Sequence, residues 1–163
     1  MTTDNRTIDL TRSAWAELVQ RAGVDPLRET GGILLGWRHK GGIHVEQTIE
    51  VLDRQAGHTW YRRRHAPAEA ALAAVLEHVP ENSALGYVGE WHTHPARVGP
   101  SFHDRRELRR ISGKTTHEVA LLVAAHEKDS STWVPVGLTA LGSRIRAAVV
   151  DIAATETVEE EGR

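Results

Sequence analysis

The sequence predicts a single mixed α/β domain, in which a sheet with both parallel and antiparallel strands packs against helices. The chain has 163 residues, 40% of them hydrophobic and 26% charged, so it can enclose a core and has a globular composition. Strand and helix patterns alternate loosely along the chain, with a hairpin near the start and antiparallel strands near the end. This order argues against a strictly parallel, doubly wound fold.

The N-terminal half is expected to contain a strand, a helix and a hairpin. Thr11 or Ser13 is suited to cap the helix, and Gly23 and Pro26 are suited to end it. Residues 40–42 (Lys-Gly-Gly) provide the hairpin turn. The expected elements are the strand 7–10, the helix to about residue 22, the strands 31–37 and 43–52, and a short strand around Trp60.

In the C-terminal half, Pro67 fits the first turn of a helix that runs to about Val79. Residues 95–100 contain two prolines and a glycine and must form a loop. Ser101 is a good N-cap for the next helix, which places Asp104 at the third helical position. The remaining expected elements are the strands 85–92, 119–125, 132–141 and 145–152, and the helix that follows Ser101 to about residue 111.

Composition limits the classes of function. The formal net charge is −2, so bulk electrostatics do not indicate a nucleic-acid partner. No signal peptide and no apolar run of about 20 residues is visible, which predicts a cytoplasmic protein without a membrane partner. We expect residues 1–154 to form the domain and the acidic residues 155–163 to be a disordered tail.

Cysteine is absent, and ten histidines are present. A disulfide, a cysteine nucleophile and a thiolate metal site are therefore excluded, and any metal must be bound by histidines and carboxylates. His92 and His94 are two residues apart on a strand and project from the same face. Asp104 follows a loop long enough to fold back to them, which gives three zinc ligands and leaves one position for water, as in catalytic sites.

Hydrolysis at such a site also needs a general base. Glu29 lies at the start of a buried strand, and Glu90 lies closer in sequence, two residues before His92 and on the same face. From the residues alone both remain candidates, and Glu90 could instead orient a histidine. A simpler interpretation treats Ser101 as only a helix cap and Asp104 as a favourable charge in the first turn.

These residues resemble the JAB/MPN/JAMM metallopeptidase family, in its compact bacterial branch. The family signature reads here as Glu29, then His92-Thr93-His94-Pro95, then Ser101-Phe102-His103-Asp104. The resemblance covers roughly residues 29–123. It implies a curved mixed β-sheet flanked by helices, similar to cytidine deaminases, with Zn²⁺ held by His92, His94 and Asp104. It also implies that Glu29 is the general base and that Ser101 donates a hydrogen bond to the oxyanion.

The resemblance implies hydrolysis of a peptide or isopeptide bond at the C-terminus of a ubiquitin-like or related protein. Substrates would be such proteins or their conjugates, and partners would include activating or conjugating enzymes, as in antiphage defence. Two alternatives are a catalytically silent MPN scaffold and a RadC-type protein linked to DNA metabolism. The roles of Glu90 and His103 stay open; His103, next to Asp104, is expected on the helix surface.

Overall fold

The structure is a computed structural model that describes residues 5–51 and 65–154. The expected strand around Trp60 and the expected tail 155–163 lie outside the described residues. The elements are β1 (Arg6–Leu10), α1 (Arg12–Val24), β2 (Gly31–His39), β3 (Gly42–Glu50), α2 (His65–Leu76), β4 (Gly86–His94), α3 (Phe102–Ser112), β5 (Val119–His126), β6 (Trp133–Leu141) and β7 (Arg144–Ile152).

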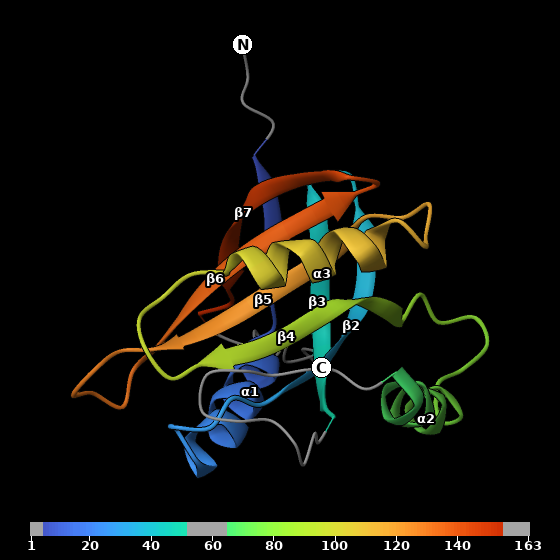
Figure 1. The fold of residues 1–163 in the computed structure, drawn as a ribbon. Coiled ribbons are helices and arrows are strands. Elements are labelled where there is room, and N and C mark those ends of the chain that lie inside the picture. Colours follow the sequence, from blue (N-terminus) through green and yellow to red (C-terminus); the bar gives the residue numbers. More distant parts are fainter. Residues whose placement is uncertain (1–4, 52–64, 155–163) are drawn as a thin grey trace, which may run out of the picture.

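The strands form a closed barrel in the order β1-β3-β2-β4-β5-β6-β7 (Figure 1). Pairing is mixed, as expected: β1 pairs in parallel with β3 and β7, and β4 with β5, whereas the other neighbours are antiparallel. The expected curved sheet thus bends far enough to close on itself. Closure depends on β1, a five-residue strand with a partner on each side, and no local sequence pattern indicates it.

The side chains of β5 belong to two separate buried apolar clusters, one on each face of the strand. Its residues alternate, so that Ala120, Leu122 and Ala124 join a cluster with the apolar face of α1. Val119, Leu121 and Val123 join a second cluster with Leu108 of α3. Burial of both faces explains the continuous apolar run of this strand. In Figure 1, α3 accordingly lies across the outside of the barrel over β5.

Trp91 of β4 belongs to the first cluster. Its side chain is fully buried, and its indole Nε1–H donates a hydrogen bond of 3.2 Å to the carbonyl of Ile49 on β3. Because neighbouring side chains on a strand point to opposite faces, burial of Trp91 on one face directs His92 to the other, where α3 packs. The tryptophan thereby fixes which face of β4 presents the histidines.

Most of the expected boundaries agree with the structure to within a few residues. The main difference that affects the site is that β4 continues to His94 instead of ending at His92. The parallel pairing with β5 continues to the end, where Thr93 is paired with Ala124 and His94 with Ala125. Both histidines therefore sit on regular strand. No helix among the described residues is long and apolar enough to cross a membrane.

Gly89 should control the fit between β4 and β5. A Cβ atom at this position would lie 2.1 Å from the carbonyl oxygen of Ala120, so Gly89→Ala must push the two strands apart. We expect the free energy of unfolding, measured by denaturant titration, to fall by about 2–3 kcal/mol.

Gly86→Ala is the matched control, because it lies on the same strand and a Cβ there has nothing within 4 Å. Its effect should stay below about 1 kcal/mol. Equal destabilisation by the two variants would show that close approach of β4 and β5 is not what requires Gly89.

Candidate metal centre

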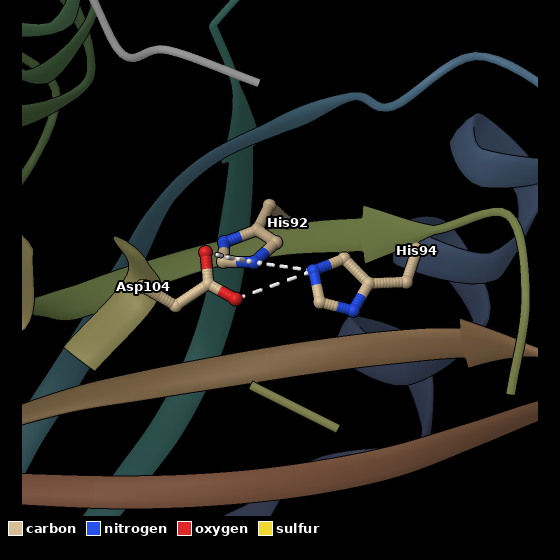
Figure 2. Close-up of side chains that lie close together, drawn as sticks. All are labelled: His92, His94 and Asp104. Atoms are coloured by element: carbon tan, nitrogen blue, oxygen red, sulfur yellow. Dashed lines mark hydrogen bonds and ion pairs between the residues drawn. The ribbon is translucent and has the colours of Figure 1, made fainter. Parts of the chain in front are cut away.

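The end of β4 supplies two imidazoles to one face of the barrel. His92 and His94 are 8% and 9% exposed, and their rings project toward the start of α3 (Figure 2). His92 is paired with Gly31 of β2 on one side and with Val123 of β5 on the other. Pairing on both sides makes this strand end a rigid base for the two rings.

The third side chain, Asp104, comes from the first turn of α3. Ser101 is the N-cap, as expected, and its Oγ accepts a hydrogen bond of 3.2 Å from the Asp104 backbone N–H. Asp104 Oδ2 in turn accepts a hydrogen bond of 2.6 Å from the Ser101 N–H, which completes a capping box. Leu108, one turn further along, is buried in the second apolar cluster and seats the helix on the barrel. The cap and the packing together direct the carboxylate at the histidines.

The three side chains form a group that could hold a metal ion. His92 Nε2 lies 3.2 Å from His94 Nε2 and 3.1 Å from Asp104 Oδ1, and His94 Nε2 lies 3.3 Å from Asp104 Oδ2. Ligands about 2.0–2.1 Å from a tetrahedral zinc would be roughly 3.3–3.4 Å apart. Each histidine nitrogen therefore lies near a different oxygen of Asp104, and these separations are close to those between neighbouring ligands of a zinc ion. The nitrogen and oxygen atoms also suit that ion.

The loop after β4 fixes the tautomer of His94. Its Nδ1 lies 2.9 Å from the carbonyl oxygen of Val98, and a carbonyl can only accept, so Nδ1 carries a proton. In the neutral ring, Nε2 then presents a lone pair to the ligand group, which is the state that a metal ligand requires. No sequence pattern predicts this contact, because a backbone carbonyl in a loop can belong to any residue type.

Electrostatics hold the ligand group together when no cation is bound. Burial by itself would lower the pKa of His94, but hydrogen bonds to Asp104 and Val98 and the charges of Asp104 and Glu29 raise it above its ordinary value. Burial would raise the pKa of the Asp104 carboxyl, yet the two imidazoles and the Ser101 N–H hold that pKa well below its usual range. These interactions favour a positive charge at His94, either as a proton on the ring or as a bound cation.

Glu29 and Glu90, the two candidate bases, have different surroundings. Glu29 is 7% exposed and lies just before β2, where its charge acts on His94. Glu90 is 8% exposed and accepts a hydrogen bond of 3.3 Å from the Tyr87 hydroxyl. A hydrogen bond to Glu107 mainly raises the pKa of Arg110, and the charge of Glu90 adds a smaller contribution in the same direction. Both carboxylates lie outside the group formed by the three ligands. The described interactions therefore link Glu29 to the centre and Glu90 to the far half of α3.

Two further residues of the motif lie at the rim of the centre. Ser101 is exposed, and its capping bond uses the hydroxyl oxygen only as an acceptor, which leaves the hydroxyl proton available to another acceptor. His103 is exposed on α3, as expected. The structure thus groups His92, His94 and Asp104, places Ser101 and His103 at the start of α3, and links Glu29 to the group through its charge on His94.

Comparison with known proteins identifies the family. Residues 11–138 match the family described as prokaryotic homologs of the JAB domain, which covers most of the chain. The chain belongs to the prokaryotic JAB family. All strands that carry the site, as well as α3, lie within the matched part of this JAB domain.

Two individual proteins similar to this JAB domain are informative. A "CD-NTase/cGAS isopeptidase" from Enterobacter hormaechei subsp. hoffmannii (strain UCI 50) is 31% identical over 116 residues, or 69% of this chain. That match spans 62% of the length of the relative. The solution structure of a Desulfitobacterium hafniense protein covers 96% of this chain and 99% of its own, with a TM-score of 0.67. At 17% identity, this likeness shows a shared fold alone.

Metal analysis should test the ligand group directly. The purified JAB domain should contain about one zinc per chain, and His92→Ala and Asp104→Ala should each remove most of it, because two ligands cannot complete the site. His117→Ala, at an exposed histidine far along the chain, is the control and should keep its zinc. Equal zinc contents in all four proteins would contradict the ligand group.

The raised pKa of His94 predicts opposite pH dependences for the metal-free and zinc-loaded proteins. In the metal-free protein, protonated His94 stabilises the fold beside Asp104. This contribution is complete below the unfolded pKa of about 6.5 and is lost as the pH rises through the raised folded value. Zinc requires the neutral ring, so the zinc-induced rise in Tm should grow between about pH 5.5 and pH 8.

The pKa of His44 is also raised, because burial lowers it less than the hydrogen bonds to Glu46 and Asp9 raise it. It therefore adds a pH dependence of the same sign to the stability of the metal-free protein, and the contribution of His94 must be separated from it. The quantity to follow is therefore the Tm of the metal-free wild type minus that of metal-free His94→Gln, measured by calorimetry at each pH. We expect this difference to decrease toward high pH. A difference that stays constant or increases would be inconsistent with a stabilising proton on His94.

Proposed function

We propose that this JAB domain is a zinc-dependent peptidase or isopeptidase that cleaves a bond at the C-terminus of a ubiquitin-like or related protein. The observation that carries the proposal is the group of His92, His94 and Asp104, in which the two Nε2 atoms lie 3.2 Å apart and each lies 3.1–3.3 Å from one carboxylate oxygen. The buried Glu29 acts on His94 through its charge. A centre with three protein ligands and one open position is typical of catalytic zinc, and structural zinc is bound by four.

In this proposal each residue has a defined task. His92 Nε2, His94 Nε2 and a carboxylate oxygen of Asp104 hold the zinc. The bound ion would lower the pKa of a water molecule to roughly 7 and polarise the substrate carbonyl. The Val98 carbonyl keeps His94 in the tautomer that binds metal, and the capping box keeps Asp104 in place. The ligands themselves take no part in proton transfer.

Glu29 acts as the general base and then as the general acid. Its carboxylate accepts a proton from the attacking water, and the oxygen of that water forms the new bond to the carbonyl carbon. The same proton passes from Glu29 to the leaving amine as the C–N bond breaks, so the reaction consumes one water and regenerates the carboxylate. Burial of Glu29 and its influence on His94 support this role.

Ser101 stabilises the charge that develops on the carbonyl oxygen. Its hydroxyl proton is not used by the helix cap, and the residue is exposed at the edge of the centre. A single donor of this kind typically contributes about 100-fold or more to kcat. The α3 N-terminus adds a positive partial charge on the same side.

The name of the Enterobacter relative guides the choice of substrate. That protein is called a "CD-NTase/cGAS isopeptidase", and we extend the substrate class to this chain: a CD-NTase-like or ubiquitin-like protein joined through its C-terminal carbonyl to an amine of another protein. The partners would be that conjugate and the enzymes that form it. The family match and this relative favour the peptidase interpretation over a RadC-type role in DNA metabolism.

A cleavage assay with defined fusions should test the activity. The probes are the C-terminal tail of a CD-NTase and that of a ubiquitin-like protein, each joined to the N-terminus of a fluorescent protein. We expect zinc-loaded protein to release the fluorescent protein with its N-terminal amine free, as read by mass spectrometry. A chelator should abolish release and added zinc should restore it. Zinc binding without cleavage of either probe would instead support the silent scaffold.

Glu29→Gln should keep zinc and lose activity. The amide has nearly the shape of the carboxylate but cannot take up a proton, so kcat should fall by about 100-fold or more while the zinc content stays the same. Glu77→Gln makes the same chemical change at an exposed glutamate beyond α2 and should leave kcat unchanged. Full activity in Glu29→Gln would require another base, with Glu90 the first to test.

A further inference from the structure

Thr93 lies between the two histidine ligands and has no role in the mechanism proposed above. On β4 its side chain points to the face opposite His92 and His94, and it is only 1% exposed. It therefore reaches neither the ligand group nor a bound substrate. A buried hydroxyl still needs partners, and the partners of Thr93 lie on β2.

The Thr93 hydroxyl takes the place of a backbone group in the pairing of β4 with β2. The Thr93 N–H donates to the Thr30 carbonyl at 2.8 Å, as in an ordinary antiparallel pair. The return bond does not go to the Thr93 carbonyl: the Thr30 N–H donates to Thr93 Oγ1 at 2.9 Å. The hydroxyl also lies within donating distance of the Thr30 carbonyl, at 3.4 Å. Both backbone polar groups of Thr30 are thus bound by a single residue.

Thr30 is held from its other side as well. Its hydroxyl donates a hydrogen bond of 3.1 Å to Glu50 of β3, and the carbonyl of the next residue, Gly31, accepts from the Val51 N–H at 2.9 Å. Thr30 is consequently tied to both neighbours of β2 at the point where the loop after α1 becomes strand. The residue on the loop side of this tie is Glu29, whose charge acts on His94.

We propose that Thr93 is a positioning residue: its side-chain hydroxyl fixes the backbone at Thr30 and so sets where the Glu29 carboxylate lies relative to the metal centre. The inference rests on the proposed function, in which Glu29 transfers the proton. The segment His92–His94 then supplies two ligands from one face and, from the other, the clamp for the base. The ligands and the residue that clamps the base share one short strand, which ties the position of Glu29 to that of the metal centre.

The test compares Thr93→Val, which keeps the shape without the hydroxyl, with Thr93→Ser, which keeps the hydroxyl. With the zinc-loaded protein and the CD-NTase tail fusion, Thr93→Val should retain the zinc content and KM but lose about 10- to 100-fold in kcat, as misplacement of a base by up to 1 Å would cause. Thr93→Ser should stay within roughly threefold of wild type. Thr93→Ala repeats the loss of the hydroxyl should Thr93→Val fold poorly.

Two further measurements separate positioning from a merely structural role. Amide hydrogen exchange at Thr30, which needs no activity, should be faster in Thr93→Val by about tenfold or more than in wild type. In a Glu29→Gln background, Thr93→Val should cause no additional loss of kcat, because the base it positions is already absent.

The outcomes distinguish this inference from the proposed function. Unchanged kcat in both Thr93→Val and Thr93→Ala, or a full additional loss in the Glu29→Gln background, would overturn the positioning role while zinc-dependent cleavage by the wild type stands. A wild-type chain that neither binds zinc nor cleaves the probes would overturn the proposed function and the role of Thr93 in it. Thr30 exchange that does not respond to Thr93→Val would overturn the clamp itself.

Discussion

The Asp104 carboxylate connects the two parts of the molecule that form the candidate centre. One of its oxygens accepts the Ser101 N–H at the start of α3 and also lies 3.3 Å from His94 on β4, while the other lies 3.1 Å from His92. The same carboxylate therefore caps a helix and completes the ligand group. Because a buried anion is costly without compensating charge, this carboxylate requires cationic partners, supplied by a protonated imidazole or by a metal ion.

The barrel makes such a junction possible. Burial of β5 on both faces places one apolar cluster against α1 and another beneath α3, so that a helix is seated on the outside of the strands next to β4. Trp91 fills the inner cluster and thereby turns His92 outward. Packing of Trp91 on the inner face of β4 thus orients His92 and His94 on the outer face, and no further residue is needed to set that direction.

Loops complete the arrangement without supplying ligands. The Val98 carbonyl selects the tautomer of His94, and the end of the α1–β2 connection brings Glu29 close enough to influence the same ring. Membership of the prokaryotic JAB family and 31% identity to a named isopeptidase agree with an assembly of this kind. The candidate centre therefore combines the regular end of β4 with two connections, the loop that contains Val98 and the segment that ends at Glu29.

The sequence by itself determined most of the elements and the three candidate ligands, because these depend on local rules: i and i+2 share a face of a strand, and Ser101 three residues before Asp104 forms a capping box. It also indicated Glu29 as the base, but only through family resemblance, since proximity along the chain to the histidines favoured Glu90. The tertiary structure decided that the sheet closes through β1, that β4 extends to His94, and that Val98 and Thr30 make their contacts. Those features depend on hydrogen bonds between strands and loops distant in sequence, which leave no periodic pattern in the residues themselves.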